Sequence, residues 1–336
     1  MKICVVGATG LVGQEMIRVM EEMNLGEDVF FPVASERSAG QKVVYRDKEY
    51  PVITLENALG QSPQIAIFSA GASVSREWAP KFADRGTFVV DNSSAWRKEQ
   101  GIPLVVPEIN AAVIRPEDRI IANPNCSTIQ LVMVLAPLHR EFGIRRVVVA
   151  TYQSVTGSGA KGMLQLENER KGMGGRLFYP HPVDLNLIPQ AGEFTEGGYT
   201  TEEEKLAFET CKIIGDDRIK VTATAVRVPV YGGHSEAVNI ELERPFDVDY
   251  VRELLSGETG IVVQDDPAAA LYPMPKFARG HNEVFVGRIR RDPTIAYGLN
   301  LWIVADNLRK GAATNAVQIA QYLIQSGWIR KNHSGQ

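Results

Sequence analysis

The feature that most constrains the fold is a glycine-rich turn close to the N-terminus. Residues 2–6 have the composition of a buried strand, and Gly7, Gly10 and Gly13 follow it before an amphipathic helical stretch. In this order the glycines permit a tight turn, let the backbone approach a pyrophosphate and let the helix pack on its strand. We therefore expect a dinucleotide-binding sheet, with a purely structural glycine turn as the alternative.

The segment after the next expected strand bears on the choice of dinucleotide. That strand covers residues 29–34 and ends just before Glu36, Arg37 and Ser38. An acid at this place binds the ribose 2′-hydroxyl of NAD, whereas an arginine accommodates the 2′-phosphate of NADP. Arg37 with the Ser38 hydroxyl favours NADP, and a solvated turn is the alternative.

Strands and helices continue to alternate through the first half of the chain. Strands are expected at residues 64–69 and 87–91, with a helix at about 73–85 between them. Such alternation predicts a parallel sheet whose ligands gather at the carboxyl ends of the strands. Arg97 follows one of these ends, where it is either an anion clamp or an ordinary surface arginine.

Cys126 is the candidate nucleophile. It lies in Asn-Pro-Asn-Cys-Ser-Thr, after an expected strand at 119–122 and at the start of an expected helix at 127–142. Unpaired N–H groups and the helix dipole favour a thiolate there, and the thiolate is the nucleophilic form of cysteine. The alternative is a small buried residue at a helix cap. Cys4 and Cys211 lack this context and are expected to be structural.

The second half has a different organisation. Long strands with few helices between them predict a mixed or antiparallel sheet, and they are expected at residues 144–154, 218–228, 237–242, 284–291 and 295–305. Proline and glycine crowd between 172 and 198, which is typical of a functional loop or an interface arm. A helix at 308–324 is expected to pack on the first domain.

Two segments of this half carry candidate binding groups. Arg227 lies on an apolar strand face, where a charge is costly unless a partner such as a substrate carboxylate pairs with it. His234 is expected in a loop before the strand at 237, and it is structural unless it meets Cys126. Glu202 and Lys205 share one helix face, which is either a site or a solvated surface.

Composition excludes several classes of protein. A chain of 336 residues predicts about two domains, and a net charge of −4 offers no footprint for nucleic acid or an anionic membrane. The N-terminus does not read as a signal peptide, and no stretch is long and apolar enough to span a bilayer. Three distant cysteines argue against a disulfide framework or a zinc site, so we expect a cytoplasmic protein without a metal.

Along nearly its whole length the chain resembles the aspartate-semialdehyde dehydrogenase family. The motifs that carry the resemblance are, in order, GATGLVG, SERSAG, NSSAWR, NPNCST, YQSVTGSG, EEEKLAFETCKI, RVPVYGGHSE and DNLRKGAA. The resemblance implies NADPH-dependent reductive dephosphorylation of L-aspartyl 4-phosphate to L-aspartate 4-semialdehyde, on the route to lysine, threonine, methionine and diaminopimelate. It also implies a homodimer formed through the second domain.

The fold expected from the pattern and the resemblance is α/β. A Rossmann-type NADP-binding domain at 1–126, completed by a C-terminal helix at 307–336, joins an α+β catalytic and dimerisation domain at 127–306 with a mostly antiparallel or mixed sheet.

The resemblance also implies roles for individual residues. Cys126 would form a thioester with the substrate, Gln153 would orient the acyl group, and His234 would act as acid and base. Arg227 would hold the α-carboxylate. Glu202 would bind the amino group, with Glu203 as its rival because three glutamates leave the register open. The phosphate would be bound by Arg97, Asn125 and Lys205.

Cofactor contacts implied by the resemblance come from both halves of the chain. They are Gly7, Thr9, Gly10, Leu11, Val12, Gly13, Arg37, Ser38, Thr156, Gly157 and Asn307. The family usually has serine where this chain has Thr156, a change that keeps the hydroxyl.

Two rival functions remain open. N-acetyl-glutamyl-phosphate reductase and glyceraldehyde-phosphate dehydrogenase use the same acyl-thioenzyme chemistry on a similar plan, although their cysteine segments read differently from NPNCST. A non-catalytic nucleotide-sensing dimer that has kept the fold would bind NADPH without acylation of Cys126.

Overall fold

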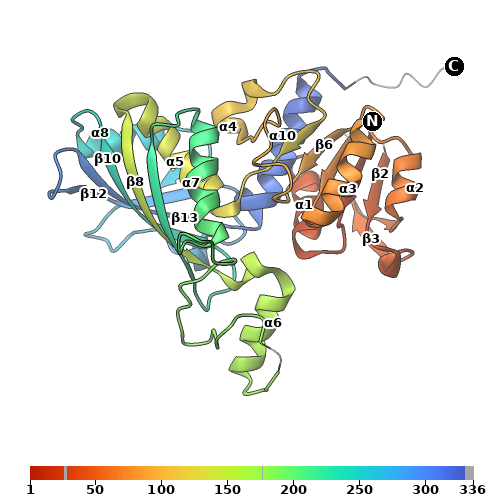
Figure 1. Ribbon diagram of the computed structural model, residues 1–336, viewed down its shortest axis with the longest axis horizontal. Coiled ribbons are helices and arrows are strands. Elements are labelled where there is room, and N and C mark those ends of the chain that lie inside the picture. Colours follow the sequence, from red (N-terminus) through yellow and green to blue (C-terminus); the bar gives the residue numbers. More distant parts are fainter. Residues whose placement is uncertain (26–28, 176, 330–336) are drawn as a thin grey trace. The chain divides into compact units, whose positions relative to one another are not determined.

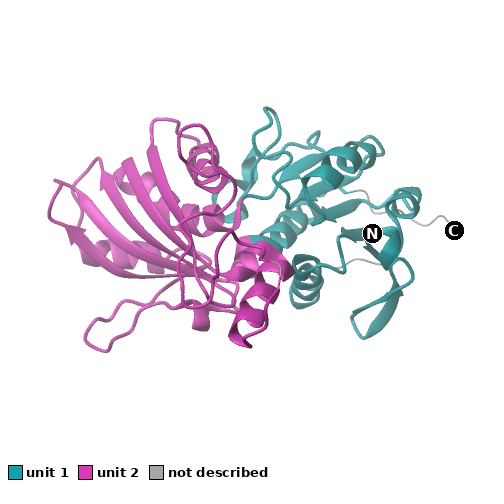
Figure 2. Cartoon of the chain, turned by 60° about the horizontal axis from the view of Figure 1, so that its bottom comes forward, with its two compact units in different colours: residues 1–124, 312–336 teal, residues 125–311 magenta. Residues whose placement is uncertain are grey.

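The computed structural model describes residues 1–25, 29–175 and 177–329. The chain forms two compact units (Figures 1 and 2): unit 1 comprises residues 1–124 and the C-terminal segment from Ala312, and unit 2 comprises Asn125–Gly311. The domain prediction places the corresponding limits at 126/127 and 306/307.

Unit 1 contains a parallel sheet. Its described strands run in the order β2-β1-β5-β6-β7, and every neighbouring pair is parallel. The strands are β1 (Lys2–Val6), β2 (Val29–Val33), β5 (Ile65–Phe68), β6 (Phe88–Asp91) and β7 (Ile120–Ala122). This sheet confirms the predicted Rossmann-type fold.

The other elements of unit 1 surround this sheet. The helices are α1 (Leu11–Glu22), α2 (Leu55–Gly60), α3 (Ala72–Ala83), α4 (Pro107–Asn110) and α10 (Thr314–Gln325). A hairpin of β3 (Lys42–Tyr45) and β4 (Lys48–Pro51) forms a separate small sheet. This hairpin is not among the predicted elements.

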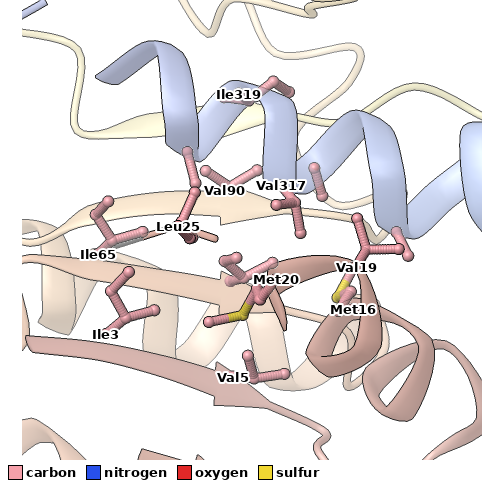
Figure 3. Close-up of a cluster of buried hydrophobic side chains, with 14 of the residues drawn as sticks. Ile3, Val5, Met16, Val19, Met20, Leu25, Ile65, Val90, Val317 and Ile319 are labelled. Carbon is pink, nitrogen blue, oxygen red and sulfur yellow. The ribbon is translucent and has the colours of Figure 1, made fainter. Parts of the chain in front are cut away.

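The core of unit 1 joins segments far apart in the sequence. Figure 3 shows Met16 and Met20 of α1 and Val317 of α10 in one cluster with strand residues such as Ile3 and Val90, and all of them are fully buried. Burial of each such side chain stabilises the unit by about 1.5–3 kcal/mol relative to exposure. The apolar periodicity of α10 is therefore explained by its place against α1 and the parallel sheet.

Unit 2 contains a mixed sheet, as predicted. Its described strands run in the order β11-β12-β13-β10-β8-β9, with parallel pairs at β8·β9 and β11·β12 and antiparallel pairs elsewhere. The strands are β8 (Ile144–Gln153), β9 (Lys220–Arg227), β10 (His234–Leu242), β11 (Ile261–Val263), β12 (Val284–Asp292) and β13 (Gly298–Ala305).

Helices of unit 2 pack on this sheet. α5 (Cys126–Phe142) contacts β8, β10 and β13, α7 (Thr201–Ile214) contacts β9, and α8 (Val248–Ser256) contacts β12. Alternate residues of β8, among them Val147, Val149, Thr151 and Gln153, are buried, as the period of a strand requires. α9 (Pro275–Ala278) packs beside β13.

A long excursion extends from unit 2. It begins with α6 (Gly159–Arg170), which Figure 1 shows apart from the six-stranded sheet. Apart from isolated bridges, its described residues between Arg170 and Thr201 form no helix or strand, as the crowding of proline and glycine predicts. Its exposed apolar side chains include Leu185, Leu187 and Phe194.

One expectation about local structure was wrong. His234 does not lie in a loop before a strand at 237. It opens β10 and pairs with Ala305, because Gly232 and Gly233 complete the turn at φ values of +75° and +79° that other residues rarely adopt. The helix expected at 308–324 is confirmed, although its first turn is a π-helix at Arg309–Ala313 and α10 starts at Thr314.

Other expectations concern cysteines and membrane spans. Burial raises the pKa of Cys4, and burial together with Asp217 and Asp216 raises the pKa of Cys211, so neither thiol is activated. None of the described helices combines the length and the hydropathy needed to cross a bilayer.

Candidate active site

Cys126 is the first residue of α5, which confirms its predicted place at a helix start. Asn125 caps the helix, and its side-chain oxygen accepts a hydrogen bond of 2.9 Å from the Ser127 backbone N–H. Other N–H groups of the first turn and the positive end of the helix dipole favour a thiolate at this position. Cys126 is half-buried.

The backbone around Gly311 packs tightly against the nucleophile. A Cβ atom at Gly311 would lie 2.9 Å from the Cβ of Cys126. Gly311 belongs to the π-helix, and its N–H donates to the carbonyl oxygen of Asp306 at 3.1 Å. The glycine of the DNLRKGAA segment thus leaves room for the Cys126 side chain.

Gln153 and Arg227 end two neighbouring strands, where the parallel register places them opposite each other. The Gln153 Nε2 donates to the Ser127 Oγ at 2.9 Å, next to Cys126. The Arg227 Nη1 donates to the Ser154 carbonyl oxygen at 2.8 Å, and its Nε has no hydrogen-bond partner among the described residues. The buried guanidinium therefore retains the capacity to bind a carboxylate.

His234 lies beside Arg227. A Cβ atom at Gly157 would be 2.9 Å from the Arg227 Nη1 and 3.0 Å from the His234 Nε2, so the two side chains converge on the same point. His234 is fully buried, and the Ser154 backbone N–H donates to its Nδ1 at 3.1 Å. Burial, followed by the Arg227 charge, lowers the pKa of His234 to about 3, against smaller opposing effects of Glu202 and of a hydrogen bond with the Gly233 backbone.

Glu202, in the first turn of α7, faces the nucleophile's helix. Its Oε1 accepts a hydrogen bond of 2.7 Å from the Asn125 Nδ2, and its Oε2 lies 3.2 Å from the Lys205 Nζ. Burial alone would raise the pKa of Glu202, but Lys205, Asn125 and Arg227 outweigh it and hold the pKa below its ordinary value. A half-buried carboxylate is therefore kept ionised beside two cations.

Glu203, the rival for the same role, is engaged elsewhere. One of its carboxylate oxygens accepts from the Thr200 N–H at 2.6 Å in a capping box, and the other accepts from the Ala225 N–H at 2.8 Å. Of the two glutamates, Glu202 therefore lies in the constellation with Arg227, and Glu203 supports the start of α7.

Three residues predicted to contact the cofactor lie together in unit 2. The Asn307 Oδ1 accepts hydrogen bonds from the Thr156 Oγ1 at 3.0 Å and from the Gly233 N–H at 3.1 Å. Gly157 follows Thr156 and borders His234. The predicted cofactor contacts of unit 2 therefore lie next to His234.

The remaining cofactor candidates form the turn between β1 and α1 in unit 1. Gly7 has a φ of +88°, and a Cβ atom there would meet the Ser69 carbonyl oxygen at 2.4 Å. A Cβ at Gly13 would lie 2.1 Å from the Gly7 carbonyl oxygen, so only glycine allows this close approach. Gly10 precedes α1 as its N-cap, and the rest of the set follows the same turn, namely Thr9, Leu11 and Val12.

The other predicted residues of unit 1 lie at further strand ends. Arg37 and Ser38 form a 3-10 turn after β2, where Arg37 is exposed and Ser38 is half-buried. Arg97 follows β6, is buried, and donates from Nη2 to the Asn92 carbonyl oxygen at 2.9 Å. Arg97 thus belongs to unit 1, whereas the other two predicted phosphate ligands, Asn125 and Lys205, belong to unit 2.

Sequence reasoning missed four residues of this site. Ser127 binds Gln153, Ser154 contacts His234, Gly311 contacts Cys126, and the Glu209 carboxylate accepts from the Asn125 N–H at 2.7 Å. Glu209 follows Glu202 by seven residues, so helical periodicity alone would have placed it on the same face. Gly311 gives no such signal, because its contact depends on tertiary structure.

Family models match both units of the chain. A model described as "Semialdehyde dehydrogenase, NAD binding domain" matches residues 2–116, and one described as "Semialdehyde dehydrogenase, dimerisation domain" matches residues 135–310. The aspartate-semialdehyde dehydrogenase of Aquifex aeolicus is 48% identical over 98% of this chain and 99% of its own length. That of Bacillus subtilis is 44% identical over 96% of each chain.

Solved structures agree with these relatives. Aspartate semialdehyde dehydrogenase II of Vibrio cholerae, in complex with ASA, has a TM-score of 0.92 and 42% identity, covering 96% of this chain and 98% of its own. The enzyme of Candida albicans with NADP has a TM-score of 0.77 and 27% identity, covering 98% and 99%. The chain is therefore an oxidoreductase that belongs to the aspartate-semialdehyde dehydrogenase family.

Proposed function

We propose that this enzyme uses NADPH to convert L-aspartyl 4-phosphate to L-aspartate 4-semialdehyde and phosphate through a thioester on Cys126. The step leads toward lysine, threonine, methionine and diaminopimelate. The observation that carries the proposal is the constellation in unit 2: a thiol at a helix start beside Gln153 and Ser127, with Arg227 and His234 converging on one point.

The charges of the site match a free amino acid. Arg227 offers a guanidinium to an α-carboxylate, and Glu202 offers an ionised carboxylate to an α-ammonium group. An N-acetylated substrate would lack the ammonium group and could not form this ion pair with Glu202. The Vibrio cholerae relative solved with ASA supports the same choice.

The chemistry follows from the placement of the nucleophile. The Cys126 sulfur attacks the β-carbonyl carbon, the bond from that carbon to the phosphate oxygen breaks, and phosphate leaves with the electron pair. Asn125 and Lys205 would bind the leaving dianion. Gln153, held by Ser127, would orient the acyl group. After reduction of the acyl carbon, the carbonyl re-forms and the sulfur leaves as a thiolate.

The glycine turn of unit 1 fits a dinucleotide. Because Gly7 and Gly13 have no Cβ, the backbone of the turn can pack closely at the start of α1. This is the conformation in which such a turn binds a pyrophosphate. The exposed guanidinium of Arg37 suits a 2′-phosphate. Thr156, Gly157 and Asn307 of unit 2 are the other proposed cofactor contacts. NADPH, when bound, supplies the hydride that reduces the thioester.

Acylation of Cys126 tests the catalytic proposal directly. Intact-protein mass spectrometry after mixing with L-aspartyl 4-phosphate, without cofactor, should show an aspartyl adduct that the Cys126→Ala variant lacks. If neither protein is modified while both bind NADPH normally, the chain is a nucleotide-binding relic and the proposal fails. Turnover of N-acetylglutamate semialdehyde faster than aspartate semialdehyde would instead reassign the substrate.

The preference for NADP over NAD is tested at Arg37. Replacing it with alanine removes the cation that would neutralise the 2′-phosphate, so the affinity for NADPH should fall much more than that for NADH. Binding titrations with both dinucleotides measure the difference. Equal losses for the two would contradict the role given to Arg37.

We also propose a homodimer formed through unit 2. The matching family model is a dimerisation domain, and the excursion exposes Leu185 to 95% of its possible area beside the exposed Leu187 and Phe194. Sedimentation equilibrium should give a dimer that Leu185→Asp weakens. A cytoplasmic location is proposed because the three cysteines, all of them described, form no disulfide; cell fractionation would test it.

A further inference from the structure

The excursion from unit 2 contacts Arg227 through both the backbone and the side chain of that residue. Ile188 and Arg227 form an antiparallel bridge, in which the Arg227 N–H donates to the Ile188 carbonyl oxygen at 2.8 Å and the Ile188 N–H donates back at 3.0 Å. The ring centroid of Tyr179, a buried residue of the same excursion, lies 5.8 Å from the Arg227 Cζ. The excursion therefore forms part of the surroundings of this arginine.

Tyr179 is held by α6, the helix that opens the excursion. The buried Gln165 accepts at Oε1 from the N–H groups of Phe178 and Tyr179 at 2.7 and 2.8 Å. Its Nε2 donates to the His181 carbonyl oxygen at 3.1 Å. The other buried members of the apolar cluster that contains Tyr179 are Val155, Leu166, Val183 and Ile188. Hydrogen bonds thus fix the backbone of Tyr179, and packing fixes its ring.

The next turn of α6 holds the rest of this loop. The Glu169 Oε2 accepts hydrogen bonds from the N–H groups of Val183 and Asp184 at 2.8 and 2.7 Å. Arg170 donates from Nε to the Asp184 Oδ1 at 3.0 Å and from Nη2 to the Pro229 carbonyl oxygen at 2.9 Å. Pro229 lies shortly after the end of β9, so the excursion is hydrogen-bonded to that side of the site as well.

An aromatic ring can stabilise Arg227 without using its hydrogen-bond donors. Arg227 is buried, and a buried cation is costly unless a group of negative potential faces it. The face of an aromatic ring provides that potential within about 6 Å, whereas a carboxylate in the same place would take up N–H groups. The Arg227 Nη1 donates to the Ser154 carbonyl oxygen, and its Nε has no hydrogen-bond partner among the described residues. Donors therefore remain for the carboxylate of a ligand.

Tyr179 takes part as a neutral ring. Burial raises the pKa of Tyr179 above its ordinary 10.0, and the smaller opposing effects of Arg227 and of the Ser158 side chain do not reverse this. The phenol therefore keeps its proton near pH 7. The contact with Arg227 is accordingly a cation–π contact and not an ion pair.

We propose that Tyr179 is a positioning residue whose ring holds the Arg227 guanidinium in the orientation that binds the α-carboxylate of the substrate. The excursion then determines how strongly the enzyme prefers an amino-acid aldehyde to an aldehyde without a carboxylate. Tyr179 acts through Arg227 and needs no contact with the substrate. The inference rests on the role proposed above for Arg227.

Two substrates separate this role from a merely structural one. 3-Aminopropanal is aspartate semialdehyde without its carboxylate, so it cannot use Arg227. Loss of the cation–π contact in Tyr179→Leu should raise the KM for aspartate semialdehyde about fivefold, with kcat within about twofold, and should leave kcat/KM for 3-aminopropanal within about twofold. Tyr179→Phe keeps the ring and should behave as the wild type with both. Equal losses for the two substrates in Tyr179→Leu would overturn the inference.

A series of fluorinated rings tests the same contact with little change in packing. Phenylalanine, difluorophenylalanine and pentafluorophenylalanine at position 179 have similar sizes, but fluorine progressively removes electron density from the face of the ring. The KM for aspartate semialdehyde should rise in this order at constant Tm, because the attraction between the ring and the cation weakens. A KM that does not follow the series would refute the contribution of the ring, even if Tyr179→Leu fails to fold.

Neighbouring residues provide the controls. Phe178→Leu removes a ring that is 47% exposed beside Tyr179, and it should leave the KM for aspartate semialdehyde unchanged. A rise equal to that of Tyr179→Leu would show that the excursion as a whole is responsible, and not the Tyr179 ring. Arg227→Lys should raise the same KM but spare 3-aminopropanal. If it does so while Tyr179→Leu impairs both substrates alike, only this inference fails. If Arg227→Lys impairs both alike, the proposed role of Arg227 fails, and this inference fails with it.

Discussion

The space left by Gly157 offers a sharp test of the site's geometry. Gly157 is not among the glycines with positive φ, so alanine fits its backbone. The new Cβ would lie 2.9 Å from the Arg227 Nη1 and 3.0 Å from both Cε1 and Nε2 of His234, whereas ordinary contacts begin at 3.4 Å. Both side chains must therefore shift by about 0.4–0.5 Å, the differences between these distances.

The size of the effect follows from how these side chains are held. His234 is fully buried against Ser154, and Arg227 donates to the same residue at 2.8 Å, so neither moves without cost. Overpacking of this kind costs about 1–3 kcal/mol, or roughly 2–12 °C in Tm for a unit of this size. A misplacement of 1 Å costs about 10²-fold in rate, so a shift of about half that distance should lower kcat by roughly tenfold.

The assay is phosphate-dependent oxidation of aspartate semialdehyde with NADP, combined with thermal unfolding. Gly60→Ala is the control, since a Cβ there meets nothing within 4 Å and φ is not positive; it should match the wild type. Wild-type kcat in Gly157→Ala would refute the reasoning. So would a loss confined to the KM for NADP, because that would place the new methyl group against the cofactor and not against Arg227 and His234.

Three further predictions concern other parts of unit 2. Gly311→Ala should reduce the rate at which iodoacetamide alkylates Cys126 by about tenfold, because the new Cβ would crowd that residue; an unchanged rate would contradict this. Burial raises the pKa of Glu236 well above its ordinary 4.5, so stability should fall as pH rises from 4.5 toward the raised pKa, and Glu236→Gln should flatten that fall in thermal melts. An identical pH dependence in both proteins would exclude this. Glu202→Gln should raise the semialdehyde KM with little change in Tm, whereas Glu203→Gln should lower Tm by weakening the α7 cap; the reverse pattern would exchange their roles.

Local pattern was enough for much of the fold. The glycine turn at Gly7, Gly10 and Gly13 predicted the β1-turn-α1 unit, because it reflects backbone conformation and close approach within one short segment. The start of α5 at Cys126 was predicted for a similar reason, since capping is a property of adjacent residues. The burial of Ala223, Ala225 and Arg227 along β9, with the exposed Thr224 between the first two, likewise reflects the period of a strand.

The choice between neighbouring residues depended on structure. Glu202 and Glu203 have the same chemistry, and only the packing of α7 directs one toward Asn125 and the other toward the Thr200 and Ala225 backbone. The helical content of the last segment was similarly predictable, but its π-helical start at Arg309–Ala313 was not.

What the sequence by itself determined is the set of chemical groups: a thiol at a helix start, a dinucleotide turn, and a histidine and an arginine in one motif. Only the tertiary structure decided how those groups act. Ser154, whose N–H donates to the Nδ1 of His234, is 80 residues away from it in the sequence. Gly311, the last residue of unit 2, packs against Cys126 near its start. Such contacts arise from strand register and helix packing, which join residues that no local periodicity relates.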